Sequence, residues 1–122
     1  MPIENFPQQN IQELLSYLPQ LRTMNLAAPI IPPSRQAADL LHAFDRLEFT
    51  KPGFDYNTWL AVRPEGFASD MQVLEYADFE TLRNLVTANL RIERFVGGYI
   101  DSLLQKGYFQ KVLERLQELN NV

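Results

Sequence analysis

The stretch "DFETLRNLVTANLRIERFVGGYIDSLLQ", residues 78–105, decides the fold of this chain. Its apolar residues recur every three or four positions, which is the period of an α-helix. Asp78 is a typical N-cap, and Glu80 would lie in the first turn, where the helix dipole favours an acid. Gly107, just beyond, is a typical residue after a helix end. We therefore expect one long helix over about 78–105, with apolar side chains around most of its circumference, at the centre of the domain.

The rest of the chain also has helical patterns, and no segment alternates with the two-residue period of a strand. Ser34 and Asp55 are expected N-caps, Ser69 with Gln72 matches a capping box, and Pro19 is expected to end the first helix. The predicted fold is all-α: one compact domain over 1–122, with about five helices around the long central helix. Further helices are expected over about 7–18, from Ser34 to about 49, after Asp55, after Ser69, and over about 108–119 at the C-terminus. Residues 20–33, which contain three prolines, are expected to form an irregular connection within this domain.

The composition excludes several classes of function. The chain has 122 residues, a net charge of -4 and a pI near 4.9, so a basic nucleic-acid-binding surface is not expected. It has no cysteine and one histidine, so we expect no metal site and no thiolate catalysis. No run approaches the ~20 apolar residues of a membrane span, and no signal peptide is visible. We expect a cytoplasmic protein that acts without a membrane, a metal or a cofactor.

A polar line runs along the predicted long helix. Thr87, Arg91, Arg94 and Gly98 are spaced four, three and four residues apart, so they lie on one side of a helix. Two guanidiniums with a hydroxyl beside them match the donors that bind phosphate or carboxylate. The alternative is that each arginine pairs with an acid of another helix or lies in water. Thr87, Arg91 and Arg94 are the candidate ligand- or partner-binding residues.

Two polar residues fall on the apolar side of the same helix. Asn89 and Glu93 are four residues apart, so their side chains can meet. A carboxylate that faces a core needs a partner, because an unpaired buried charge costs several kcal/mol. Asn89, Arg63 or an aromatic donor is the expected partner of Glu93. We interpret the pair as a buried polar network, because general acid–base catalysis would need a second group that the sequence does not show. Gly97 and Gly98 are expected to allow close helix crossing.

The C-terminal two-thirds of the chain, about 54–119, resembles a bacterial family of small proteins known as domain of unknown function 6508. The resemblance is carried by "FDYNTWL" (54–60) and by a threonine–arginine–acid–arginine–phenylalanine–glycine pattern followed by a second glycine. The matching residues are Thr87, Arg91, Glu93, Arg94, Phe95, Gly98 and Gly107. Val86 departs from the pattern, which has leucine there. The resemblance supports the helical fold and implies no activity.

The sequence favours a non-enzymatic role, with no catalytic residue assigned. The leading hypothesis is a small helical protein that binds another protein or itself. The alternative is an anion-, nucleotide- or small-molecule-binding domain that uses Arg91 and Arg94.

Overall fold

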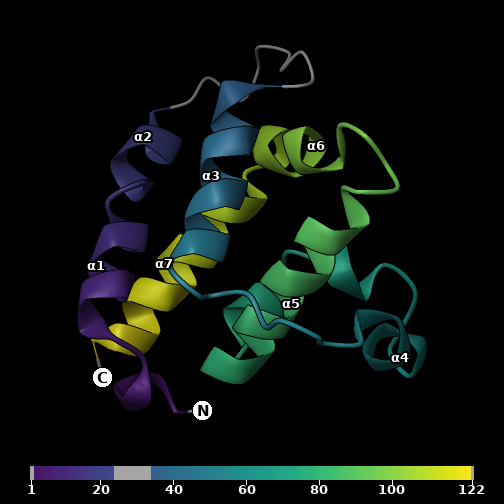
Figure 1. The fold of residues 1–122 in the computed structure, drawn as a ribbon, viewed down its shortest axis with the longest axis horizontal. Helices are drawn as coiled ribbons and strands as arrows, with labels where there is room; N and C mark the ends of the chain where they lie inside the picture. Colours follow the sequence, from purple (N-terminus) through teal and green to yellow (C-terminus); the bar gives the residue numbers. More distant parts are fainter. Residues whose placement is uncertain (1, 24–33, 122) are drawn as a thin grey trace.

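The computed structural model describes residues 2–23 and 34–121, and every regular element within these ranges is a helix (Figure 1). The all-α prediction is confirmed. In chain order the elements are the short 3-10 helix η1 (Ile3–Asn5), α1 (Gln8–Leu15), α2 (Leu18–Arg22), α3 (Arg35–Arg46), α4 (Tyr56–Ala61), the 3-10 helices η2 (Phe67–Ser69) and η3 (Val73–Glu75), α5 (Phe79–Ile92), α6 (Tyr99–Lys106) and α7 (Tyr108–Asn120).

Three helices begin where capping residues predict. The side chains of Ser34, Asp55 and Asp78 each accept the backbone N–H three residues along, at 3.0, 3.1 and 2.8 Å. Each cap satisfies an N–H that the first helical turn would otherwise leave unpaired. Capping is a local interaction, which is why these three starts were predictable.

Other predicted boundaries are wrong. Pro19 does not end helical structure; it lies in the first turn of α2, where a missing N–H is tolerated. Ser69 closes η2, and the carboxylate of Asp70 accepts the N–H of Gln72 at 2.9 Å instead. The predicted irregular connection over 20–33 begins inside α2, and its residues 24–33 lie outside the described ranges.

The prediction of one long helix over 78–105 is also wrong. The chain turns between Ile92 and Tyr99 and forms two helices, α5 and α6. A continuous helix would be about 42 Å long, whereas a small domain is about 30 Å across. Gly98 adopts a left-handed backbone, with φ of 84°, which a glycine reaches without steric cost. Splitting the helix lets α6 turn back and pack on α3 and α7.

The core is built around α5 and α7. Every residue from 82 to 90 is buried, and α7 contacts α1, α2, α5 and α6. Phe6 and Phe49 each pack edge-on against Phe79, with ring centroids 5.5 and 5.9 Å apart. In Figure 1, α1 and α2 lie on one side of the molecule and α4 on the other, with α5 between them. The turn between α5 and α6 is left at the edge of this core.

Candidate functional site

The turn from Glu93 to Gly98 has a defined structure. The N–H groups of Phe95 and Val96 both donate to the Ile92 carbonyl, at 2.9 and 3.0 Å. The Glu93 carboxylate accepts the N–H groups of Gly98 and Ile100, at 3.1 and 2.8 Å. Glu93 therefore caps the start of α6, where the positive end of the helix dipole favours a carboxylate. Its partners are backbone N–H groups, whereas the sequence had suggested Asn89, Arg63 or an aromatic side chain.

Two apolar side chains project from this turn into solvent. Phe95 is 80% exposed and Val96 is 52% exposed. Arg94 beside them is also exposed, and within the described ranges no hydrogen bond or ion pair holds its guanidinium. Gly97 has open space around the position of a side chain, so the predicted close helix crossing at this glycine is wrong. We call Arg94, Phe95 and Val96 the turn knob.

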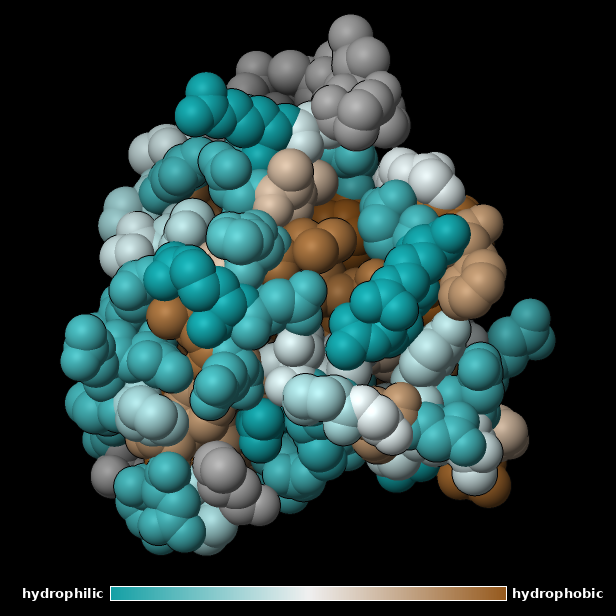
Figure 2. Space-filling view, in the orientation of Figure 1, coloured by the Kyte–Doolittle hydropathy of each residue, from teal (hydrophilic) through white to brown (hydrophobic). Residues whose placement is uncertain are grey.

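A hollow of about 200 Å³ lies beside the turn knob, between the first turns of α3 and α6. In Figure 2 the apolar surface gathers in this region, next to α3. Glu93 and Gly98, the two ends of the turn, also line the hollow, so the knob stands at its rim. The other lining residues are Ser34, Ala37, Ala38, Leu41, Ile100 and Asp101.

Asp101 is the least satisfied polar group described in the structure. The residue is only 4% exposed, and its Oδ1 is shielded from solvent without a hydrogen-bond partner. Its Oδ2 accepts one long bond, 3.4 Å, from the Ser34 N–H at the start of α3. Asp101 lies in the first turn of α6 and bonds to the start of α3, and the positive end of a helix dipole favours a carboxylate at both places. The hollow therefore joins apolar walls to an acid that lacks a close partner.

The predicted line of Thr87, Arg91 and Arg94 is divided in the structure. Thr87 is fully buried: its hydroxyl donates to the Arg83 carbonyl at 2.7 Å and accepts the Lys51 N–H at 3.0 Å. The Arg91 side chain is 20% exposed and lies 3.9 Å from the Asp45 carboxylate. Arg94 comes after α5 has ended, so the three side chains do not form one exposed stripe.

Asn89 is fully buried and joins three elements. Its amide nitrogen lies 2.9 Å from the Ala68 carbonyl and 3.0 Å from the Tyr108 hydroxyl, and its oxygen accepts the Tyr99 hydroxyl at 2.7 Å. Burial raises the pKa of both tyrosine hydroxyls, so they stay protonated at neutral pH. The network fixes α5 against η2, α6 and α7. Glu93 is not bonded to it.

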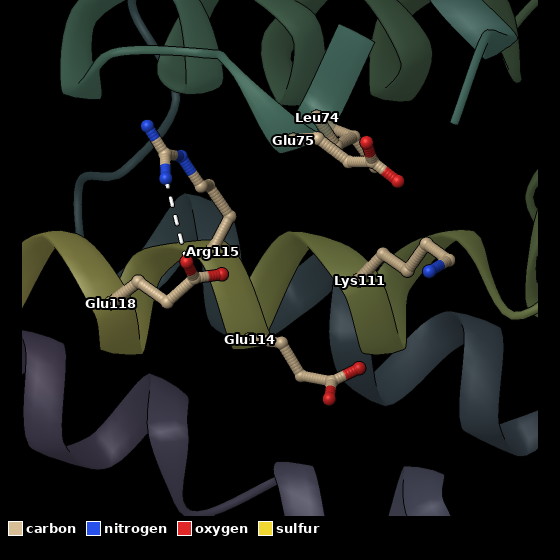
Figure 3. A pocket seen from close by; sticks show the side chains of 6 residues that line it. All are labelled: Leu74, Glu75, Lys111, Glu114, Arg115 and Glu118. Carbon is tan, nitrogen blue, oxygen red and sulfur yellow. Dashed lines mark ion pairs between the residues drawn. The ribbon is translucent and has the colours of Figure 1, made fainter. Parts of the chain in front are cut away.

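A charged depression of about 130 Å³ lies between η3 and α7 (Figure 3). Arg115 is engaged there: it donates to the Ala77 carbonyl at 2.8 Å and lies 3.6 Å from Glu118. Lys111 and Glu114 of α7, together with Leu74 and Glu75, complete its lining. A further pocket of about 380 Å³ contains Arg83, which donates to two backbone carbonyls. In both places the arginine already has structural partners.

Sequence reasoning missed the hollow and Asp101. The only local signal was an acid in the first turn of a helix, which is common and is usually solvated. Within residues 2–23 and 34–121 there is no group of three or more His, Asp or Glu placed to hold a metal ion. No helix in the described part of the chain has the length and apolarity needed to cross a membrane.

Comparison with known proteins identifies the family and no activity. No curated protein and no solved structure matches the chain. A family model matches residues 6–122, well beyond the stretch 54–119 on which the sequence resemblance rested. The chain belongs to the family of unknown function DUF6508.

Proposed function

We propose that this protein is a non-enzymatic interaction module that binds a protein partner through the turn knob and the adjacent hollow. The exposure of Phe95 carries the proposal. A phenylalanine contributes about 1.5–3 kcal/mol when it moves from water to an apolar environment. Aromatic and arginine side chains are also the types that dominate the binding energy of interfaces.

The immediate surroundings of Phe95 support this role. Val96 extends the apolar surface, Arg94 adds a cation that has no partner in the described part of the chain, and the apolar hollow begins at the same turn. The candidate for acid–base chemistry, Glu93, is already occupied by two backbone N–H groups. We place this interaction in the cytoplasm, as the sequence predicts.

Photo-crosslinking tests the proposal. A photoreactive amino acid is introduced at Val96 in one variant and at Val62, 81% exposed on α4's C-terminal side, in a control. We expect a discrete crosslinked adduct from position 96 in cells that is missing from position 62 and is lost when Phe95→Ser is added. The same adducts from both positions, or adducts unaffected by Phe95→Ser, would contradict the proposal.

A second candidate function is anion binding by Arg91 and Arg94. The specific observation in its favour is that, among residues 2–23 and 34–121, Arg94 has no hydrogen-bond or ion-pair partner and the ion pair of Arg91 is a contact of 3.9 Å with Asp45. Thr87 is no longer part of this candidate site because it is buried. Thermal unfolding with inorganic phosphate and with ATP tests it, because a ligand at 100 times its dissociation constant adds about 2.7 kcal/mol. A stabilisation that survives Arg94→Ala, or none at all, would contradict it for these ligands.

A further inference from the structure

We infer that the pocket lined by Arg83 is a binding site for a free amino acid with an apolar side chain, whose carboxylate is bound by Arg83 and whose ammonium group is bound by Glu48 and Asp45. This pocket shares no lining residue with the hollow beside the turn knob. The inference therefore goes beyond the proposed function and does not depend on it.

The pocket has the size of a small-molecule site. It lies where the start of α1, the end of α3 and the middle of α5 meet, and its volume is about 380 Å³. Small-molecule sites generally have volumes of about 300–1,000 Å³. Of the four pockets delimited by described residues, this is the one that falls in the range, because the others measure about 130, 200 and 210 Å³.

Arg83 is a buried cation without an acid partner. It is 8% exposed, and in the described part of the chain no carboxylate forms an ion pair with it. Its Nε and Nη2 donate to backbone carbonyls, whereas its Nη1 has no bond within these residues. Solvent reaches Nη1, because the one shielded side-chain nitrogen or oxygen without a bond in this part of the chain is Oδ1 of Asp101. A guanidinium in this state is a receptor for a carboxylate.

Two carboxylates line the same pocket. Glu48 is exposed, and among residues 2–23 and 34–121 its side chain has no hydrogen bond or ion pair. Asp45 accepts the Thr50 hydroxyl at 2.7 Å, and its side chain is 42% exposed. Neither acid pairs with Arg83, so the pocket holds separate positive and negative groups. A simple anion would be repelled by the acids and a simple cation by Arg83, whereas a zwitterion is attracted at both ends.

The remaining walls fit an apolar side chain. Phe6, Pro7 and Pro52 line the pocket together with the charged groups. The ring of Phe6 lies 5.4 Å from the guanidinium carbon of Arg83, so an apolar surface adjoins the cation. A small number of placed charges within apolar walls is the usual composition of a ligand site. The combination selects an amino acid with an apolar side chain over an inorganic anion.

Isothermal titration calorimetry with L-valine, L-leucine, L-isoleucine, L-methionine and L-phenylalanine is the first test. The tightest of them is then compared with its amide, which lacks the carboxylate, and with its des-amino analogue, which lacks the ammonium group. We expect both analogues to bind weaker, the amide by roughly tenfold or more because it loses a charge-assisted contact with Arg83. No binding of any of the five at millimolar concentration, or analogues that bind as tightly as the amino acid, would overturn the inference.

A variant that preserves the size of its side chain tests the ammonium contact. Glu48→Gln should raise the dissociation constant of the amino acid by about two- to fivefold, because an exposed ion pair is lost. Glu75→Gln makes the same change of charge at an exposed acid outside the pocket and should leave the constant unchanged. Arg83→Ala is not used, because this guanidinium also bonds two backbone carbonyls. Equal constants for the two glutamine variants would contradict the assignment of Glu48.

Chemical shifts in NMR spectra of the ¹⁵N-labelled protein locate the bound amino acid. We expect the changes to gather at the backbone amides of residues 45–52 and at the Nε–H of Arg83. Changes that gather at residues 93–98 instead would overturn the inference and place the ligand at the turn knob. The photo-crosslinking of position 96 is a separate measurement, so failure of the amino-acid site leaves the proposed function intact.

Discussion

The guanidinium of Arg83 holds the left-handed backbone of Glu48 in place. Its Nη2 donates to the Glu48 carbonyl at 3.1 Å, and its Nε donates to the Phe49 carbonyl at 2.9 Å. Among the residues that the structure describes, Glu48 is the one non-glycine residue with a positive φ, which is 61°. It follows the last turn of α3. The Phe49 N–H reaches back to the Phe44 carbonyl at 3.0 Å, which completes a Schellman motif. A buried arginine of α5 therefore secures the end of α3.

Arg83→Ala should destabilise the protein strongly. Arg83 is 8% exposed, burial lowers its pKa, and the substitution leaves two carbonyls without their donor. We expect a loss of about 3 kcal/mol in the free energy of unfolding, measured with urea. Arg35→Ala, which removes a side chain that is 92% exposed, should change it by less than about 0.5 kcal/mol. A small effect at Arg83 would show that the turn does not need it.

Glu48→Gly should stabilise the protein. A left-handed backbone costs an L-residue about 1–2 kcal/mol. Glycine avoids this cost, but it gives the unfolded chain more conformational entropy, and the larger entropy loss on folding offsets part of the gain. The net gain should be about 0.5–1 kcal/mol in urea unfolding. Glu48→Ala keeps the steric cost and serves as the control, so it should give no such gain. A destabilised glycine variant would mean that the Glu48 side chain itself contributes to stability.

Asn89→Leu should cost about 3 kcal/mol or more. The substitution removes the amide that bonds the Ala68 carbonyl and both tyrosine hydroxyls. The Tyr108 hydroxyl keeps its bond to the Ala68 carbonyl, at 2.9 Å, but the Tyr99 hydroxyl loses its acceptor. Tyr99→Phe removes only one hydroxyl, at the half-buried edge of the network, and should cost about 1 kcal/mol. Calorimetric melting of the two variants measures the difference, and equal losses would argue against a shared network.

Asp78→Ala should cost about 1 kcal/mol at neutral pH, because it removes the N-cap of α5. Hydrogen bonds from Thr81 lower the pKa of Asp78 below its unfolded value. The stabilisation from this carboxylate is therefore complete above the unfolded pKa of about 3.9 and is lost as the pH falls through the folded pKa. Urea titrations from pH 7 to pH 2.5 should show the two proteins converging in stability at the acid end. A gap that stays constant with pH would contradict a charge-dependent cap.

Local signals in the sequence were enough to predict the class of fold and several helix starts. Ser34, Asp55 and Asp78 cap helices because their side chains bond to N–H groups only three residues away. The spacing of apolar residues likewise predicted that α7 would bury one face. These features depend on the periodicity of apolar residues and on hydrogen bonds between residues a few positions apart, so the sequence alone predicts them.

The candidate site was only partly predictable. The sequence drew attention to Arg94 and Glu93 but placed them on a continuous helix, whereas both belong to a turn. It grouped Thr87 with the arginines, yet Thr87 is buried and its hydroxyl accepts the backbone N–H of Lys51, thirty-six positions earlier in the chain. Asp101 gave no signal, because its burial depends on the start of α3.

The sequence by itself determined that this chain forms helices and which faces of them are apolar, because periodicity and capping act within a few residues. Only the tertiary structure decided that residues 93–98 turn, that Phe95 remains exposed and that Asp101 is buried with one carboxylate oxygen unbonded. The physical reason is that these outcomes depend on contacts between residues far apart in the chain, namely the packing of α6 on α3 and α7. Burial and hydrogen bonding across such distances override what a single helix would prefer.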